Sequence, residues 1–375
     1  MTDTNPSLNR RIINRRITHL DTVRGVAVMG ILIINSISFG LGNVAVFDIS
    51  TVGTVTNLDW VLAIVGEIFA DQKFMGLFSL LFGASLLLFL DRVTERTPSP
   101  VRLSLWRNLL LLAIGVVHSL FWVGDILVVY ALCAPILLML GQVSPKALIL
   151  TGMVVFISAV IPPLILNSEI DDAGLRAVWG GDDLHPQAGA IFLEIMCDVF
   201  SRALGMMMIG MGLYRSGFLT RPISRKSLVR CLSGIAVGAL LSAAGLIWVA
   251  CHGFDARAVV LGNIPNTLAT IPMTLGYLGV LMGWDERATD GLIRCVRAVG
   301  RMALTNYLAQ TFLCLQLAKM IPTESVTRTS IWVAILFIWA GQLIFSEFWL
   351  RRYRMGPLEW LWRCATYRCW FPLLR

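Results

Sequence analysis

Residues 107–130 decide the fold, and their sequence is RNLLLLAIGVVHSLFWVGDILVVY. The two apolar runs predict a membrane helix, a short turn at Gly124 and a second membrane helix that runs back. Two ionisable side chains interrupt this pattern, because His118 falls near the end of the first helix and Asp125 at the start of the second. Ionisable groups within membrane spans are costly and suggest function. The hairpin therefore predicts both the fold class and the first candidate site.

The composition of the whole chain agrees with a membrane protein. Of its 375 residues, 57% are hydrophobic and only 14% are charged, whereas soluble domains contain about 25% charged residues. We therefore predict an all-α, polytopic transmembrane helix bundle of about ten spans, each of roughly 20 residues, in one integral membrane domain. The predicted spans lie near Leu20–Gly40, Phe74–Leu90, Ser104–Trp122, Ile126–Gln142, Ala147–Leu166, Ala190–Tyr214, Cys231–Cys251, Val259–Gly283, Met302–Met320 and Ile331–Leu350.

The basic residues predict the topology. Arginine and lysine gather in the N-terminal segment 1–19, in alternate loops and in the C-terminal tail 351–375, as they do on the cytoplasmic side of membrane proteins. We expect both termini in the cytoplasm and the acidic loop 167–189 outside. The shorter apolar segment Leu58–Ala70 fits an eleventh span, a re-entrant segment or an interfacial helix, and counting it as a full span would break the charge pattern.

Charge and cysteine usage limit the expected partners. In a membrane protein, a net charge of +8 indicates contact with the anionic headgroups of the lipid bilayer, so we expect no nucleic-acid partner. The eight cysteines form no CxxC pair and no His/Cys cluster with metal-ligand spacing, so we expect no metal site. The sequence leaves a homo-oligomer open.

His118 is the leading catalytic candidate. A turn at Gly124 brings Asp125 close, and a carboxylate can hold one histidine tautomer and stabilise the imidazolium during proton transfer. Such an imidazole can deprotonate a hydroxyl or an amine as a general base. Tyr130, about one turn into the second helix, could donate a hydrogen bond to the same space. The structural alternative is a histidine bonded within the bundle, with Asp125 capping the second helix.

Further buried polar residues are candidates for substrate binding. Asp21 and Arg24 share one helical face at the inner end of the first span, where the guanidinium could hold a phosphate-rich molecule or form an interfacial ion pair. Asp198 and Arg202 predict an ion pair that lines a polar cavity or is purely structural. Three amide side chains could line a central cavity or bind neighbouring helices, namely Asn35, Asn306 and Gln310.

Several ordered sequence blocks carry a family resemblance. They include LDTVRG at 20–25, His118 followed by GDIL at 124–127, GRMALTNYL at 300–308 and GPLEWLWR at 356–363. In these blocks the chain resembles the YeiB-like bacterial inner-membrane proteins, a family catalogued as a domain of unknown function. Through the first-span pattern and the histidine in a later span, it is also distantly similar to transmembrane acyltransferases, which include the lysosomal heparan acetyltransferase and glucan-modifying enzymes.

The resemblance implies a multi-pass protein of the bacterial inner (plasma) membrane. Its implied activity is transfer of an acyl group, such as acetyl, from cytoplasmic acyl-CoA to a hydroxyl or amine of a sugar, lipid or small molecule at or beyond the outer face. In that mechanism Asp21 and Arg24 lie near the entrance for acyl-CoA, and His118 is the base in the wall of a polar tunnel. The developing oxyanion is then stabilised by Asn35, Asn306 or Arg202.

Two alternatives come from other classes. Buried charges also mark substrate pathways, so the chain fits a small-molecule or lipid transporter without acyl-transfer chemistry, although it shows no internal repeat. A non-catalytic membrane scaffold is the third hypothesis. Within the enzyme hypothesis, His118 lies nearer the outside than acyl-CoA, so either the pantetheine arm reaches deep or a covalent intermediate relays the acyl group.

Overall fold

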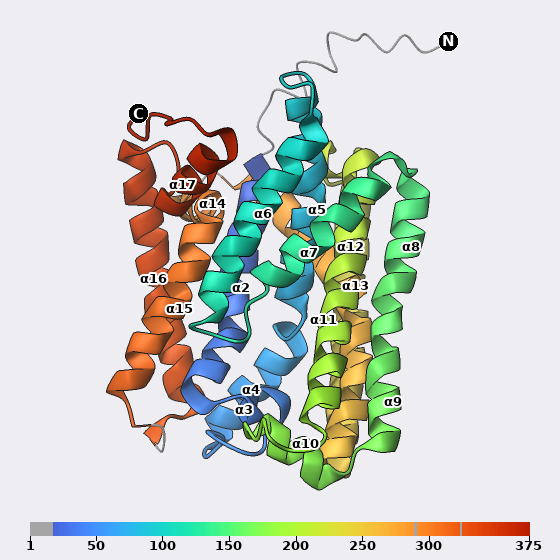
Figure 1. The fold of residues 1–375 in the computed structure, drawn as a ribbon. Coiled ribbons are helices and arrows are strands. Elements are labelled where there is room, and N and C mark those ends of the chain that lie inside the picture. The colour runs from blue at the N-terminus through green and yellow to red at the C-terminus, as the bar shows by residue number, and fades with distance from the viewer. Residues whose placement is uncertain (1–17, 289–290, 323–324) are drawn as a thin grey trace.

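The computed structural model describes residues 18–288, 291–322 and 325–375, which form a bundle of helices (Figure 1). Within these residues, seven helical segments are long and apolar enough to cross a membrane. The predicted all-α membrane fold is therefore confirmed, while the number of ten spans and the cytoplasmic termini stay predictions. Most of the basic N-terminal segment, residues 1–17, lies outside the described part of the chain.

The helices follow one another with short connections. In chain order they are α2 (Thr18–Leu41), α3 (Val44–Phe47), α4 (Asn57–Phe69), α5 (Lys73–Thr94), α6 (Pro100–Ser119), α7 (Leu127–Met139), α8 (Pro145–Ile157), α9 (Ile161–Glu169), α10 (Asp172–Trp179), α11 (Ala188–Arg215), α12 (Arg225–Cys251), α13 (Ala256–Arg287), α14 (Gly291–Arg301), α15 (Ala303–Met320), α16 (Arg328–Arg352) and α17 (Pro357–Tyr367).

Helix α2 lies at the centre of the bundle. It runs from the upper to the lower end of the molecule in Figure 1 and packs against α5, α13, α14, α15 and α16. Its buried residues Leu20, Val23 and Ala27 share a core with Leu80 of α5 and Met206 of α11. The start of α2 and the C-terminal helix α17 lie at the same, upper end, and α3, α4 and α10 lie at the lower end.

Helices α4 and α5 form one interrupted apolar segment. Residues Asn57–Thr94 together make a single span candidate of 38 residues, but α4 ends at Phe69 and α5 begins at Lys73. Between them Gln72 has a φ of 64°, a left-handed backbone conformation that α-helices of L-residues do not continue through. Leu58–Ala70 therefore forms a helix of its own, which the break at Gln72 separates from α5, and its place in the membrane stays a prediction.

The connection between α6 and α7 is longer than the short turn expected. Helix α6 ends at Ser119 and α7 begins at Leu127, so the connection comprises residues 120–126. Gly124 is required there for space, because a Cβ atom would lie 2.4 Å from a ring carbon of Trp122. The loop nevertheless folds back and brings the end of α6 beside the start of α7.

Candidate functional site

His118 and Asp125 are in direct contact at the loop end of the hairpin. Nδ1 of His118 lies 2.7 Å from Oδ1 of Asp125, and His118 is only 6% exposed. The other carboxylate oxygen of Asp125 accepts a hydrogen bond of 3.2 Å from the backbone N–H of Val128. Asp125 thus both binds the imidazole and caps the start of α7, so the two roles considered from the sequence occur together.

Two residues of α15 complete the contacts of this pair, and sequence reasoning missed both. Nε2 of His118 lies 3.0 Å from Oγ1 of Thr311, and the hydroxyl of Tyr307 donates a hydrogen bond of 3.2 Å to Oδ1 of Asp125. We call the series Thr311–His118–Asp125–Tyr307 the polar chain. Its only sequence signal is a tyrosine and a threonine one helical turn apart, which share a face of α15.

The partners of His118 indicate its tautomer. A carboxylate only accepts hydrogen bonds, so the Nδ1–H of a neutral His118 donates to Asp125. The lone pair is then on Nε2, where it accepts the hydrogen bond of the Thr311 hydroxyl. This arrangement of carboxylate, imidazole and hydroxyl is the one in which a histidine can remove a proton from a hydroxyl group.

Residues of the polar chain lie in the walls of three cavities. The arginine cavity, about 230 Å³, is lined by Arg24, Arg107, Arg301 and Tyr307. The central chamber, about 400 Å³, has polar side chains in a largely apolar wall, among them Asp125, Tyr307 and Arg202. The apolar groove, about 560 Å³, lies between α6, α15 and α17, with His118 and Thr311 in its wall.

These positions correct the expectation of a polar tunnel with His118 in its wall. His118 opens onto the apolar groove, whose wall, apart from His118 and Thr311, consists of apolar and aromatic side chains such as Leu308 and Phe312. Its hydrogen-bonded partner Asp125 faces the central chamber, and Tyr307 faces both that chamber and the arginine cavity. The reason is the packing of α15 against the hairpin, which separates the imidazole from the polar spaces.

The arginine cavity contains the predicted Arg24 and an arginine that sequence reasoning passed over. Nη1 of Arg24 lies 3.5 Å from Oδ1 of Asp21, so the predicted pair is present. The guanidinium of Arg107 lies 4.3 Å from the ring centroids of both Phe89 and Trp362. Guanidinium groups bind phosphates and carboxylates through charge-assisted hydrogen bonds, so this cavity suits an anionic group.

Asn35 and Tyr130 line different spaces. Asn35 lies in the wall of the central chamber with Asp125. Tyr130 lies in the wall of the arginine cavity, where its hydroxyl is 2.7 Å from Oγ of Ser79 on α5. The hydrogen bond of Tyr130 thus goes to α5, whereas we expected it near His118.

Asn306 and Gln310 connect helices. Nδ2 of Asn306 donates a hydrogen bond of 3.0 Å to Oγ of Ser346, and Nε2 of Gln310 donates one of 3.0 Å to Oε1 of Gln342. Both contacts join α15 to α16, and neither residue lines the arginine cavity, the central chamber or the apolar groove. Asn306 and Gln310 therefore hold neighbouring helices together, which is the structural alternative that the sequence left open.

Asp198 and Arg202 form the predicted ion pair on α11. Arg202 lines the central chamber and also a fourth space of about 280 Å³ beside it, which we call the acidic cavity. Five carboxyl residues line this cavity, namely Asp48, Glu67, Asp71, Glu194 and Asp198.

The fold and these spaces define an all-helical membrane protein with a buried polar chain and several internal cavities. Residues 213–369 match the family model described as "Protein of unknown function (DUF418)". The chain is 32% identical to "Uncharacterized protein YeiB" of Escherichia coli (strain K12), over 96% of this chain and 99% of that protein. It is 27% identical to "Uncharacterized protein YxaH" of Bacillus subtilis (strain 168), over 98% of each chain.

A third relative is an "Uncharacterized 39.9 kDa protein in amylase 3'region" of Bacillus acidopullulyticus, 29% identical over 96% of this chain and 97% of that protein. No solved structure matches the chain. The full-length similarity at 32% identity shows that the chain belongs to the YeiB-like family, as the sequence blocks indicated.

Proposed function

We propose that this protein is a multi-pass enzyme of the bacterial inner membrane that transfers an acyl group from acyl-CoA to a hydroxyl or amine of an acceptor. The observation that carries the proposal is the position of the polar chain, whose members lie in the walls of the arginine cavity, the central chamber and the apolar groove. His118 itself lines the apolar groove, and Tyr307, which binds its partner Asp125, lines the arginine cavity, so one hydrogen-bonded chain connects the walls of the two spaces.

The arginine cavity suits the donor. By the positive-inside pattern, the end of the molecule with α14 and α17 faces the cytoplasm, where acyl-CoA is found. At about 230 Å³, the cavity is smaller than the roughly 300–1,000 Å³ of common ligand sites. It therefore holds the pantetheine arm with its thioester, and the phosphates lie at its mouth, near Arg24, Arg107 and Arg301.

His118 supplies the base in this mechanism. The acceptor displaces the Thr311 hydroxyl and gives its proton to Nε2 while its oxygen or nitrogen attacks the thioester carbonyl. Asp125 stabilises the resulting imidazolium, which returns the proton to the leaving thiolate.

The apolar groove favours a substrate with a hydrocarbon chain. Leu304 and Trp362 line both the arginine cavity and the groove, so the two spaces adjoin. Burial of a hydrocarbon chain contributes about 0.8 kcal/mol per CH₂ group. Among the acceptor classes that the sequence left open, this geometry gives the most support to a lipid, whose chain lies in the groove and whose hydroxyl or amine reaches His118.

The test uses the purified protein in lipid nanodiscs with labelled acyl-CoA and an extract of bacterial membranes. We expect a labelled lipid and free CoA from the unchanged protein, and a rate lower by about 10²-fold or more for His118→Gln. Glu95→Gln, an exposed position at the end of α5, serves as the control with unchanged rate. Full activity of a correctly inserted His118→Gln protein would eliminate the proposal.

One observation favours the transporter as a second candidate. The interrupted segment α4–α5 places the fully buried Lys73 beside the break at Gln72, and discontinuous helices form the substrate sites of many transporters. Uptake of a solute by proteoliposomes without acyl-CoA would favour this function. Thioester cleavage that depends on an acceptor would favour the enzyme.

A further inference from the structure

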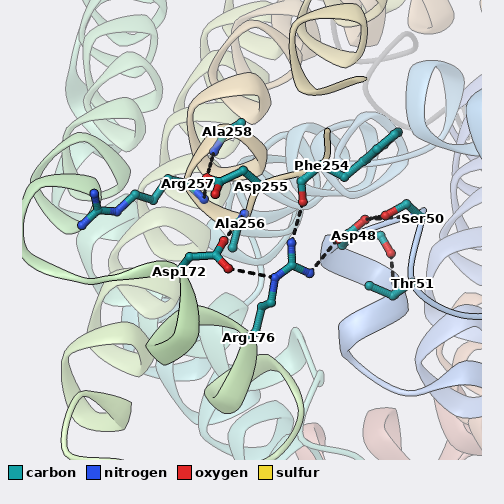
Figure 2. A network of polar contacts seen from close by, with 10 residues as sticks. All are labelled: Asp48, Ser50, Thr51, Asp172, Arg176, Phe254, Asp255, Ala256, Arg257 and Ala258. Atoms are coloured by element: carbon teal, nitrogen blue, oxygen red, sulfur yellow. Dashed lines mark hydrogen bonds and ion pairs between the residues drawn. The ribbon is translucent and has the colours of Figure 1, made fainter. Parts of the chain in front are cut away.

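The acidic cavity has an excess of carboxyl groups over paired cations. Asp198 is paired with Arg202, and Asp48 lies 3.2 Å from Nη1 of Arg176, a contact that Figure 2 shows within a wider polar network. Among the described residues, no hydrogen bond or ion pair reaches the carboxyl groups of Glu67 and Glu194, which belong to α4 and α11.

Lys73 and Arg328 act on Glu67 through their charge, but neither forms an ion pair with its carboxyl group. Nζ of Lys73 donates a hydrogen bond to Oδ1 of Asn266, and the guanidinium of Arg328 donates one of 2.8 Å to the carbonyl oxygen of Ala45. Glu67 and Glu194 are half-buried, and a carboxylate with reduced access to water is stabilised by a nearby cation, so the cavity favours a ligand with positive charge.

Within the described part of the chain, three buried polar atoms in the cavity wall have no hydrogen-bond partner. They are Oε1 of Gln72, Oγ of Ser242 and Nε of Arg202, whose residues are 7%, 2% and 8% exposed. They come from the α4–α5 break, α12 and α11, and all three residues line the acidic cavity. Buried polar atoms in native proteins are nearly always paired, so their convergence on one space points to a polar ligand.

Aromatic rings form another part of the wall. The rings of Phe47 and Trp179 stack at a centroid distance of 5.2 Å, and Phe254 lines the same cavity. The faces of aromatic rings attract ammonium groups. The wall therefore combines two features that recognise an organic cation, namely carboxylates and aromatic side chains.

We propose that the acidic cavity binds a small organic ammonium ion that carries a hydroxyl group. Its ammonium group pairs with Glu194 and donates a hydrogen bond to Oγ of Ser242. Its hydroxyl both donates to Oε1 of Gln72 and accepts from Nε of Arg202, since a hydroxyl group can do both. Among the described residues, no group of three or more His, Cys, Asp or Glu side chains is placed to hold a metal ion, so an organic cation fits better than a metal.

The acidic cavity also adjoins the central chamber. Gln72 and Arg202 line both the acidic cavity and the central chamber, so a bound ammonium compound would lie beside the space that contains Asp125. A role as acyl acceptor rests on the proposed function, whereas the binding itself does not.

The experiment measures equilibrium binding to the full-length protein in detergent micelles, without acyl-CoA. The probe is labelled ethanolamine, and labelled glycerol is the uncharged hydroxyl control. We expect saturable binding of ethanolamine and none of glycerol. Glu194→Gln should weaken ethanolamine binding about tenfold or more, because it removes a charged hydrogen-bond partner. Glu95→Gln, the same change at an exposed position outside the cavity wall, should leave binding unaltered.

A second variant tests the site without the risk that the substitution itself unfolds the protein. Ser242→Ala removes one unpartnered oxygen and no existing hydrogen bond, so it should fold normally and bind ethanolamine several-fold more weakly. Absent ethanolamine binding, equal binding of glycerol, or unchanged affinity in both variants would overturn the proposal. Acyl transfer without ammonium binding rejects this inference alone, and ammonium binding without any acyl transfer rejects the proposed function alone.

Discussion

Gly300 packs so closely against α2 that a Cβ atom at this position would lie 1.8 Å from the carbonyl oxygen of Asp21. The contact is reciprocal, because a Cβ at Gly25 would lie 2.2 Å from the carbonyl oxygen of Val296. Gly300→Ala therefore forces α14 and α2 apart, and overpacking of this kind costs about 1–3 kcal/mol. We expect a clearly lower thermal unfolding midpoint in detergent.

The matched control for this change is Gly341→Ala in α16. Apart from Gly341 itself, its two neighbours and the local helix backbone, no heavy atom of the described residues lies within 4 Å of a Cβ built at Gly341, so the added methyl group has room. The thermal midpoint of this variant should equal or exceed that of the unchanged protein. Equal midpoints for the variants at Gly300 and Gly341 would contradict the close helix contact.

Replacement of Asp125 by asparagine tests the orientation of the catalytic imidazole. The asparagine side chain has nearly the same shape, but it lacks the negative charge that stabilises the imidazolium and can donate to Nδ1 in place of accepting. We expect the rate of CoA release from Asp125→Asn to fall about 10²-fold or more, with little change in the KM for acyl-CoA. A rate within a factor of about two of the unchanged protein would exclude Asp125 from the mechanism.

Thr311 is predicted to support His118 in the resting protein. Thr311→Val has nearly the same volume but leaves Nε2 of His118 without its partner, so we expect a loss of stability of about 1 kcal/mol. Thr311→Ser keeps the hydroxyl and should lose less. Thermal midpoints of the two variants, measured side by side, check this order, and a valine variant that is more stable than the serine variant would contradict it.

Arg107 is predicted to bind the anionic donor. Loss of its guanidinium in Arg107→Gln should raise the KM for acyl-CoA about tenfold or more and leave kcat nearly constant, since the interaction is made equally in the ground and transition states. Arg102→Gln is the control, because Arg102 is exposed on the same helix. Steady-state kinetics at constant salt distinguish the two, and an unchanged KM for Arg107→Gln would remove Arg107 from the donor site.

The network in Figure 2 predicts a pH dependence of stability. Asp172 accepts a hydrogen bond from the N–H of Ala256 and lies 3.1 Å from Nε of Arg176. Partial burial acts to raise the pKa of Asp172, but these contacts outweigh it and lower the pKa below its usual value. A carboxyl group whose pKa is lowered in the folded protein stabilises the fold at pH values above its pKa in the unfolded protein, which is about 3.9. This stabilisation is lost as the pH falls through the lower pKa of the folded protein.

Asp172→Asn should therefore lower the thermal midpoint at neutral pH and have a shrinking effect at acid pH. Thermal midpoints between about pH 3 and pH 7 check whether the curves of the unchanged protein and the variant converge. Asp182→Asn, an exposed position in the same loop, is the control. A constant difference across this range would show that the ionised carboxyl group of Asp172 has no special role.

Several contacts of the site could be predicted from the sequence because they are local. His118 and Asp125 are seven positions apart across one loop, and Asp198 and Arg202 are four apart on one helix. Helix geometry places residues four apart on one face, and a hairpin brings the ends of its two helices together. The apolar runs determined the all-α membrane fold in the same way, since about 20 apolar residues in a row span a bilayer.

The tertiary structure alone decided which distant residues contact His118 and Asp125 and which cavity each of the two side chains lines. Thr311 lies 193 positions from His118, and Tyr307 lies 182 positions from Asp125. Helical periodicity shows which side chains share a face, but it does not show which other helix covers that face. That outcome depends on the simultaneous packing of all the helices, which set His118 against an apolar groove and left Asp125 and Tyr307 to line the polar spaces.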